Sequence, residues 1–162
     1  MRLIILVLLT ICLLGCGESV HQEKGDESNS FRGDLMGFDG KKVDLKDYAG
    51  KAVFINLWAT WCTPCRQEMP AIASARDSLA GKNIVFLFAS DDSQEEITAF
   101  EQEHQFKFNY VFIRNREMLS IPALPTSYVF DARGRLVHGV PGAFQWNDPE
   151  HLQLLRDAIN AQ

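Results

Sequence analysis

Two cysteines separated by two residues, Cys62 and Cys65, are the residues of this 162-residue chain whose spacing points most directly to chemistry. They lie in the stretch "NLWATWCTPCRQEMP", after an apolar run and before a pattern typical of a helix. Two thiols this close can form a disulfide with each other or exchange one with another protein, and the thiolate is the reactive form. The pair predicts thiol–disulfide exchange, with metal binding as an alternative.

The neighbouring elements explain how such a pair would be positioned. Residues 52–59 are almost continuously apolar, as expected of a strand buried on both faces, and residues 62–81 predict a helix with Pro64 in its first turn. A helix start carries unpaired N–H groups and a positive dipole end, and both favour a thiolate. We therefore expect Cys62 to be the exposed, attacking thiol. Cys65 would be the shielded thiol that resolves a mixed disulfide with the substrate.

The remaining pattern alternates strands with helices and ends in a hairpin and a last helix. Asp39-Gly40 signals a hairpin turn near the start of the domain, Ser93 and Asp148 are suitable helix caps, and Gly134 fits a turn between two strands. These features predict an α/β fold in which helices flank a central mixed β-sheet, with an N-terminal β-hairpin extension.

The first residues suggest export. Arg2 precedes an apolar run of twelve, residues 3–14, which is too short for a membrane span of about 20 residues but fits a secretory signal. The run ends in "LLGC", which resembles the lipobox of bacterial lipoproteins, in which the cysteine, here Cys16, becomes lipidated. We predict a signal peptide over residues 1–15, a flexible polar tether over 16–32 and one domain over 33–162. A signal with an incidental cysteine and an uncleaved anchor are the alternatives.

The charge and the cysteine content limit the classes of partner and the cellular compartment that we expect. The formal net charge of -5 gives no indication of a nucleic-acid partner, and we expect a monomer. Of the four cysteines, Cys12 would leave with the signal and Cys16 would carry lipid, so only the close pair remains. An exported pair meets an oxidising compartment. We expect a membrane-anchored lipoprotein on the periplasmic side of a bacterial membrane.

The string "WATWCTPC" resembles the active site of the thioredoxin superfamily. The longer "GKAVFINLWATWCTPCRQEMP" is similar to its membrane-tethered TlpA-like and ResA-like branch, and the resemblance covers residues 34–158. It implies a thioredoxin-like fold and a thiol–disulfide oxidoreductase that needs no cofactor. It also implies a reductase fed by a membrane thiol protein and acting on exported proteins, among which apocytochrome c is the best-known substrate class.

The string "LPTSYVF" matches the segment in which thioredoxin-like proteins carry a cis-proline beside the disulfide. By that resemblance Pro125 is cis rather than trans, and Leu124 exposes backbone groups that pair with an extended substrate, with Thr126 beside them. Trp61, which precedes the attacking cysteine, is expected on the surface. With Pro64, Leu124 and Pro125 it would form an apolar patch for an unfolded polypeptide.

Two further residues are interpreted against the family. Asn56 stands where thioredoxin has a buried aspartate, and it is interpreted as a strand amide bonded to the backbone. Glu68 occupies a place where ResA-like proteins carry an acid. Our hypothesis is that Glu68 accepts a proton and raises the cysteine pKa values; a solvated glutamate in an exposed turn is the alternative.

Two other functions would use some of the same residues. A copper module would use the two cysteines and a distal histidine, for which His138 is the candidate. A peroxide-reducing relative would carry a threonine where this chain has Ala59. The sequence favours neither. The other conspicuous side chains are expected to be structural, with Trp58 in the core and with surface or solvated positions for His104, His138, His151, Arg133 and Arg135.

Overall fold

A computed structural model describes residues 31–119 and 121–161 of the chain. The predicted signal peptide, Cys16 and nearly all of the predicted tether lie outside these residues. Within the described part of the chain, no helix has the length and apolar character needed to cross a membrane.

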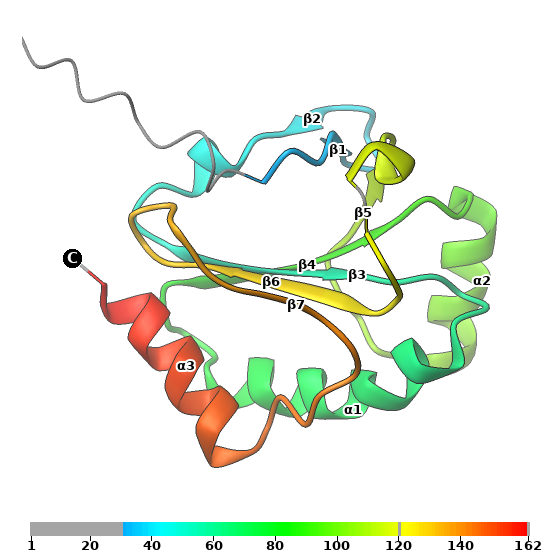
Figure 1. Ribbon diagram of the computed structural model, residues 1–162. Helices are drawn as coiled ribbons and strands as arrows, with labels where there is room; N and C mark the ends of the chain where they lie inside the picture. The colour runs from blue at the N-terminus through cyan, green and yellow to red at the C-terminus, as the bar shows by residue number, and fades with distance from the viewer. Residues whose placement is uncertain (1–30, 120, 162) are drawn as a thin grey trace, which may run out of the picture.

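A mixed sheet runs through the middle of the domain (Figure 1). Among the described residues it has seven strands in the order β2-β1-β5-β4-β3-β6-β7. The central strands β3, β4 and β5 are parallel, and the remaining pairs are antiparallel. This confirms the predicted mixed sheet. The strands are β1 (Leu35–Met36), β2 (Lys42–Val43), β3 (Ala52–Leu57), β4 (Ile84–Ser90), β5 (Tyr110–Ile113), β6 (Thr126–Phe130) and β7 (Leu136–Pro141).

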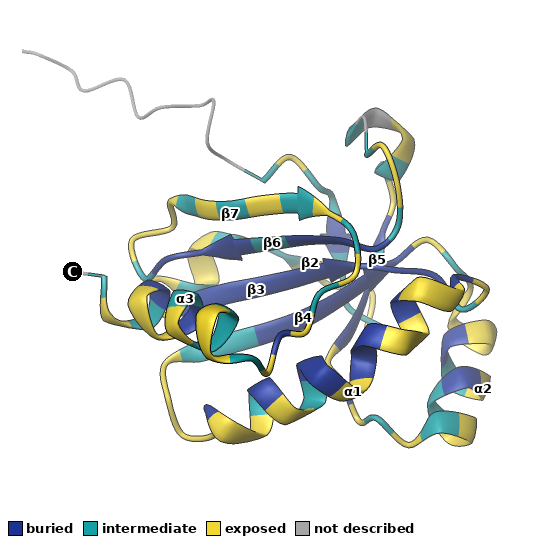
Figure 2. Ribbon diagram, turned by 60° about the horizontal axis from the view of Figure 1, so that its bottom comes forward, coloured by how far each residue is buried: buried dark blue, intermediate teal, exposed yellow. Residues whose placement is uncertain are grey.

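The α-helices share one core. Right-handed crossovers from β3 to β4 and from β4 to β5 step across the sheet in the same direction, which places both connecting helices on one face. These helices are α1 (Thr63–Ser78) and α2 (Gln94–His104). Buried side chains of both, and of α3 (Pro149–Asn160), join a single cluster with the sheet. Figure 2 shows this as buried stripes on the helices facing the buried strands.

The opposite face of the sheet is covered by smaller elements. These are the 3₁₀ helices η2 (Leu45–Tyr48) and η3 (Arg116–Leu119) and the hairpin of β1 and β2. Gly40 has a positive φ of 77° in the hairpin turn, as the Asp-Gly signal predicts. Because β1 also pairs with β5, the N-terminal hairpin extends the central sheet.

Local signals in the sequence set the helix ends. Ser93 and Glu96 form a reciprocal capping box at the start of α2, and Asp148 caps α3 with Pro149 in its first turn. Cys62 itself is the N-cap of α1, which continues through Pro70 to Ser78. The capping predictions for Ser93 and Asp148 are confirmed.

The turn between β6 and β7 is organised by a buried carboxylate that the sequence analysis missed. Asp131 is fully buried, and its Oδ1 accepts from the backbone N–H groups of Arg133 and Arg135, each at 3.0 Å. Its Oδ2 accepts from Nε and Nη2 of Arg135 at 2.8 and 2.7 Å. Both arginines are exposed, as expected of solvated charge, but the sequence analysis did not foresee that the turn brings them to one buried acceptor.

These contacts control the ionisation of Asp131. Burial by itself raises the pKa of this carboxyl, but the hydrogen bonds from Arg135 and Arg133 and the charge of Arg135 outweigh it and lower the pKa below its usual value. The carboxylate form is thus stabilised in the folded state. Its contribution to stability is present above the usual pKa of an aspartate and is lost as pH falls through the lower, folded value.

We predict that Asp131→Ala lowers the free energy of unfolding by about 2–3 kcal/mol near neutral pH, because donors of the turn lose a buried acceptor. The loss should shrink at acid pH, once the pH has fallen below the lowered pKa and the wild-type carboxyl is protonated. Urea denaturation at both pH values measures this. Asp77→Ala, which removes a more exposed partner of Arg76, serves as the control and should change little. An equal loss at both pH values would contradict the assigned role.

Candidate active site

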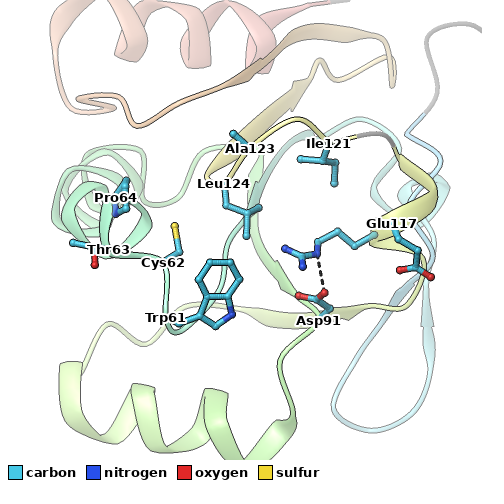
Figure 3. Close-up of a pocket in the computed structure, with 10 residues that line it drawn as sticks. Trp61, Cys62, Thr63, Pro64, Asp91, Glu117, Ile121, Ala123 and Leu124 are labelled. Carbon is cyan, nitrogen blue, oxygen red and sulfur yellow. Dashed lines mark ion pairs between the residues drawn. The ribbon is translucent and has the colours of Figure 1, made fainter.

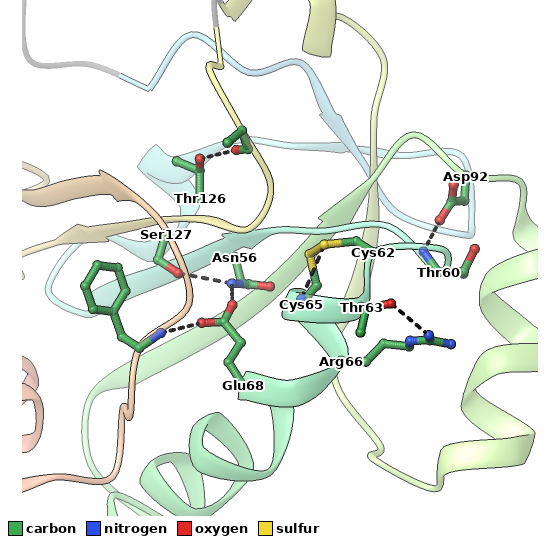
Figure 4. Close-up of a disulfide and its surroundings, with 12 residues drawn as sticks. Asn56, Thr60, Cys62, Thr63, Cys65, Arg66, Glu68, Asp92, Thr126 and Ser127 are labelled. Atoms are coloured by element: carbon green, nitrogen blue, oxygen red, sulfur yellow. Dashed lines mark hydrogen bonds between the residues drawn. A yellow bond between two sulfur atoms is a disulfide. The ribbon is translucent and has the colours of Figure 1, made fainter.

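The two cysteines form a disulfide where the central strand leads into α1. β3 ends at Leu57, and Cys62 follows as the residue that caps the helix. Cys62 and Cys65 are joined by their sulfur atoms with their Cα atoms 5.3 Å apart, and Sγ of Cys62 also accepts the backbone N–H of Cys65 at 3.3 Å. Figure 4 shows the disulfide at this first turn. The pair therefore lies at the start of a helix, as predicted.

The two sulfurs differ in access, although both residues are buried. Cys65 is completely covered, and Cys62 is only 4% exposed, so the expectation of an exposed Cys62 was wrong as stated. Cys62 nevertheless lines the groove at the surface of the domain, and Cys65 does not. In Figure 3 Cys62 lies among Trp61, Pro64 and Leu124, which explains why so little of it is exposed.

The groove has a volume of about 700 Å³. Its apolar wall includes Trp61, which is 66% exposed as predicted for a surface residue, and Leu124. A charged wall faces it, where Nε of Arg116 lies 2.7 Å from Oδ2 of Asp91. The full lining is Trp61, Cys62, Thr63, Pro64, Asp91, Arg116, Glu117, Ile121, Ala123 and Leu124.

The sequence analysis missed the charged wall. Asp91 follows directly after β4, and Arg116 lies just beyond β5. Ligands of α/β sheets bind at the carboxyl ends of the parallel strands, and β4 and β5 end at the same edge as β3. That topological rule was the signal that could have found these residues.

The segment before β6 carries the expected proline. The Leu124–Pro125 peptide bond is cis, which confirms the prediction. The carbonyl of Pro125 accepts the backbone N–H of Gly142 at 2.8 Å. Thr126 is only 2% exposed, does not line the groove and donates its hydroxyl to the carbonyl of Ala123 at 2.7 Å. The structure therefore places Thr126 inside the proline turn, away from the groove in which we expected it to bind substrate.

Beneath the disulfide, Glu68 and Asn56 form a buried pair. Glu68 is 1% exposed, and its Oε1 accepts from Nδ2 of Asn56 at 2.7 Å, while Oε2 accepts the backbone N–H of Phe144 at 3.1 Å. Nδ2 of Asn56 also donates to Oγ of Ser127 at 3.0 Å (Figure 4). A solvated Glu68 and an Asn56 amide bonded to the backbone are both wrong. The two side chains point into the space between α1 and the sheet and bond to each other.

Burial changes the ionisation of Glu68. It raises the pKa of this carboxyl from 4.5 to about 7, against the opposing effect of the hydrogen bonds from Phe144 and Asn56. The indole of Trp146 lowers the pKa further, although its Nε1 has no hydrogen bond of good geometry. Glu68 can therefore gain or lose a proton near neutral pH.

The loop between β7 and α3 closes over this carboxyl. Trp146 is fully buried and packs against Phe54, with ring centroids 4.7 Å apart. The ring centroids of His151 and His138 lie 4.9 and 5.4 Å from the ring centroid of Trp146. The prediction of surface or loop histidines was wrong for this pair, because β7 and α3 converge on Trp146. His104 is also partly buried, stacked on Phe100.

The candidate copper ligand lies in this aromatic cluster. Burial, followed by the charge of His151, lowers the pKa of His138. Within residues 31–119 and 121–161, no group of three or more histidine, cysteine or acidic side chains is arranged to hold a metal ion. His138 therefore does not lie with Cys62 and Cys65 in such a group.

The raised pKa of Glu68 makes the stability of the oxidised protein depend on pH. Between the unfolded pKa near 4.5 and the folded value near 7, the native state binds more protons than the unfolded state, so stability falls as pH rises. We predict that Glu68→Gln removes this fall, so that the stability of the variant relative to wild type rises by about 1–3 kcal/mol between roughly pH 5 and pH 8, on top of a constant loss because glutamine offers one acceptor in place of two. Urea denaturation across that interval measures it, with the exposed Glu103→Gln as control. Parallel curves for wild type and Glu68→Gln would show that this carboxyl has no raised pKa.

Comparisons with known proteins agree with this geometry. Residues 25–138 match the AhpC/TSA family. The chain is 30% identical over 155 residues to the thiol-disulfide oxidoreductase ResA of a Bacillus cereus strain, covering 87% of this chain and 88% of that protein.

Two solved structures are also similar. A thioredoxin-family thiol:disulfide interchange protein from Chlorobium tepidum TLS has a TM-score of 0.65 and 22% identity, covering 82% of this chain and 94% of that one. The exposed lipoprotein thioredoxin Etrx1 of Streptococcus pneumoniae strain TIGR4 has a TM-score of 0.59 and 29% identity, covering 76% and 97%. With its thioredoxin-like fold and its close cysteine pair, the chain belongs to the AhpC/TSA family and is a thiol–disulfide oxidoreductase.

Proposed function

We propose that the chain is a reductase of disulfides in exported proteins, with Cys62 as the attacking thiol and Cys65 as the resolving thiol. The observation that carries the assignment of roles is their unequal access to the groove. Cys62 lines it, and Cys65 is buried behind it. A substrate disulfide can therefore approach Sγ of Cys62 but not Sγ of Cys65.

The exchange then follows from the chemistry of two thiols. The thiolate of Cys62 attacks one sulfur of the substrate disulfide, a mixed disulfide forms, and the other substrate sulfur leaves as a thiolate. Cys65 loses its proton and attacks Sγ of Cys62. The mixed disulfide breaks, and the second substrate sulfur leaves. Both substrate sulfurs take up protons, and two electrons have passed from the dithiol to the substrate.

Glu68 is proposed as the group that accepts the proton of Cys65. It is buried, lies one helical turn beyond Cys65 on α1, and has a pKa of about 7. A base with a pKa near the working pH is the most effective in proton transfer. Its three contacts, to Asn56, Phe144 and the region of Trp146, hold it in place.

The groove suits an extended polypeptide. Trp61, Pro64 and Leu124 offer apolar contact next to Cys62, beside the cis-proline turn. The proposed substrates are exported proteins with disulfides, apocytochrome c among them. The proposed electron donor is a thiol protein of the membrane.

An extracytoplasmic position is proposed from the sequence and from the relatives. The apolar run at residues 3–14 fits a signal peptide, Cys16 would carry lipid, and residues 16–32 would tether the domain over 33–162. The similar structure from Streptococcus pneumoniae is described as an exposed lipoprotein. The same arrangement is proposed for this chain.

The reduction potential tests the direction of the reaction. We predict that residues 32–162, equilibrated in thiol redox buffers, give a value below about -220 mV, as expected of a protein that donates electrons. Cys65→Ser is the control and should show no reversible intramolecular couple, while it accumulates a mixed disulfide through Cys62. A value near about -120 mV would mean an oxidant and would overturn the reductase assignment. A chain without any reversible couple would overturn the proposed chemistry.

Trp61 tests the polypeptide groove. We predict that Trp61→Ala lowers kcat/KM for reduction of an unfolded protein disulfide by about tenfold, because an exposed aromatic contact is lost. Reduction of a small aromatic disulfide, which needs only Cys62, should change much less. Val137→Ala, at the other large exposed apolar side chain in the described residues, is the matched control. Equal losses on both substrates would show that Trp61 acts on the cysteines and not on the polypeptide.

A further inference from the structure

The side-chain amide of Asn56 is fully buried, and its two ends have different surroundings. Nδ2 donates to Glu68 at 2.7 Å and to Ser127 at 3.0 Å. Oδ1 has no hydrogen-bond partner among the described residues. An unpaired buried acceptor is destabilising, so a donor that reaches it in another state of the protein would be stabilising.

The orientation of this amide is set by its neighbours. If the amide were turned over, Oδ1 would lie against the carboxylate oxygen of Glu68, and two acceptors would face each other at 2.7 Å. The oxygen is therefore directed away from Glu68. Figure 4 shows it on the side of the amide that faces the disulfide.

Cys65 is the sulfur that this oxygen would meet. It lies one helical turn before Glu68 on the same side of α1, and Glu68 contacts Asn56. Cys65 is fully buried, and its backbone N–H is already bonded to Sγ of Cys62. A disulfide carries no hydrogen, whereas a reduced Cys65 presents an S–H donor. Reduction thus supplies the donor that the oxidised site lacks.

We propose that the side-chain oxygen of Asn56 accepts a hydrogen bond from the Cys65 thiol when the disulfide is reduced, and so holds the resolving thiol protonated until it is needed. The proposal rests on the proposed function in taking Cys65 as the resolving thiol. A hydrogen bond to the neutral form stabilises that form. The bond therefore raises the proton affinity of Cys65 and favours the reduced protein.

The same amide then serves the proton transfer. Once Cys62 is in a mixed disulfide, Cys65 loses its proton and its sulfur attacks Sγ of Cys62. The bond from Cys62 to the substrate breaks, and the substrate sulfur leaves and is protonated. Glu68, bonded to the other end of the Asn56 amide and one helical turn from Cys65, is the proposed acceptor of this proton once the thiol has turned away from Oδ1.

The S–H stretching band of Cys65 tests the bond directly. In the full-length chain with Cys12→Ser, Cys16→Ser and Cys62→Ser, Cys65 is the sole thiol. We expect its infrared band at a lower wavenumber than in the same chain with Asn56→Leu, which removes the acceptor at similar volume. The proposal is overturned if Asn56→Leu leaves the band unchanged.

A second measurement separates this direct contact from an effect through Glu68. The thiolate absorbance of the same single-thiol chain gives the pKa of Cys65, and Asn56→Leu should lower it by roughly one unit, a tenfold change in proton affinity. The lowering should persist in a Glu68→Gln background. If it disappears there, Asn56 acts only by positioning Glu68 and the proposal is wrong.

Ser127→Ala is the matched control, since it removes one partner of Nδ2 and leaves the oxygen in place. It should keep the low S–H band, and a shift as large as that of Asn56→Leu would count against the proposal. None of these measurements uses a substrate. They can therefore fail while wild-type exchange activity, and with it the proposed function, is retained.

Discussion

The hydrogen bonds of one buried carboxyl group, that of Glu68, tie together the parts that make up the site. Through them α1 is joined to the central strand at Asn56 and to the loop before α3 at Phe144. Asn56 in turn bonds to Ser127 on β6, the strand that follows the cis-proline. The helix that carries both cysteines is therefore fixed against the strand and the turn that shape the groove. A buried acid is costly unless it is hydrogen-bonded, so its partners are structural requirements as well as chemical ones.

The topology explains why the site can be both rigid and accessible. The parallel strands β3, β4 and β5 bring the start of α1 and the loops of Asp91 and Arg116 to one edge of the sheet. All three α-helices pack on one face, so Cys65 belongs to one continuous hydrophobic core. Cys62 lies at the boundary between that core and the groove. The unequal access of the two sulfurs is a consequence of where the helix begins.

Much of this could be predicted from local patterns, and the rest depended on contacts between distant segments. The strand before the cysteines, the caps at Ser93 and Asp148 and the hairpin turn at Gly40 follow from short stretches, and the structure has them all. The cis-proline followed from family resemblance. The errors came from side chains whose partners are far away in sequence. Glu68 forms hydrogen bonds with Asn56 and Phe144, which are 12 and 76 positions away in the sequence, and no local pattern predicts either contact.

The buried pair also suggests how an asparagine can stand where a direct proton acceptor would otherwise be placed. Asn56 cannot take up a proton, but its amide has a donor end, which bonds to Glu68, and an acceptor end, which has no partner among the described residues while the disulfide is formed. The donor end stabilises the charged form of Glu68, and burial opposes it, which leaves a pKa of about 7. The ionisable group beside the disulfide is therefore Glu68 on α1, one helical turn from Cys65, and not a residue of β3. If the reduced Cys65 thiol bonds to the oxygen of this amide as proposed, proton uptake by Glu68 and the state of the disulfide are linked through Asn56, because a change at either end of the amide alters the hydrogen bonds available to the other.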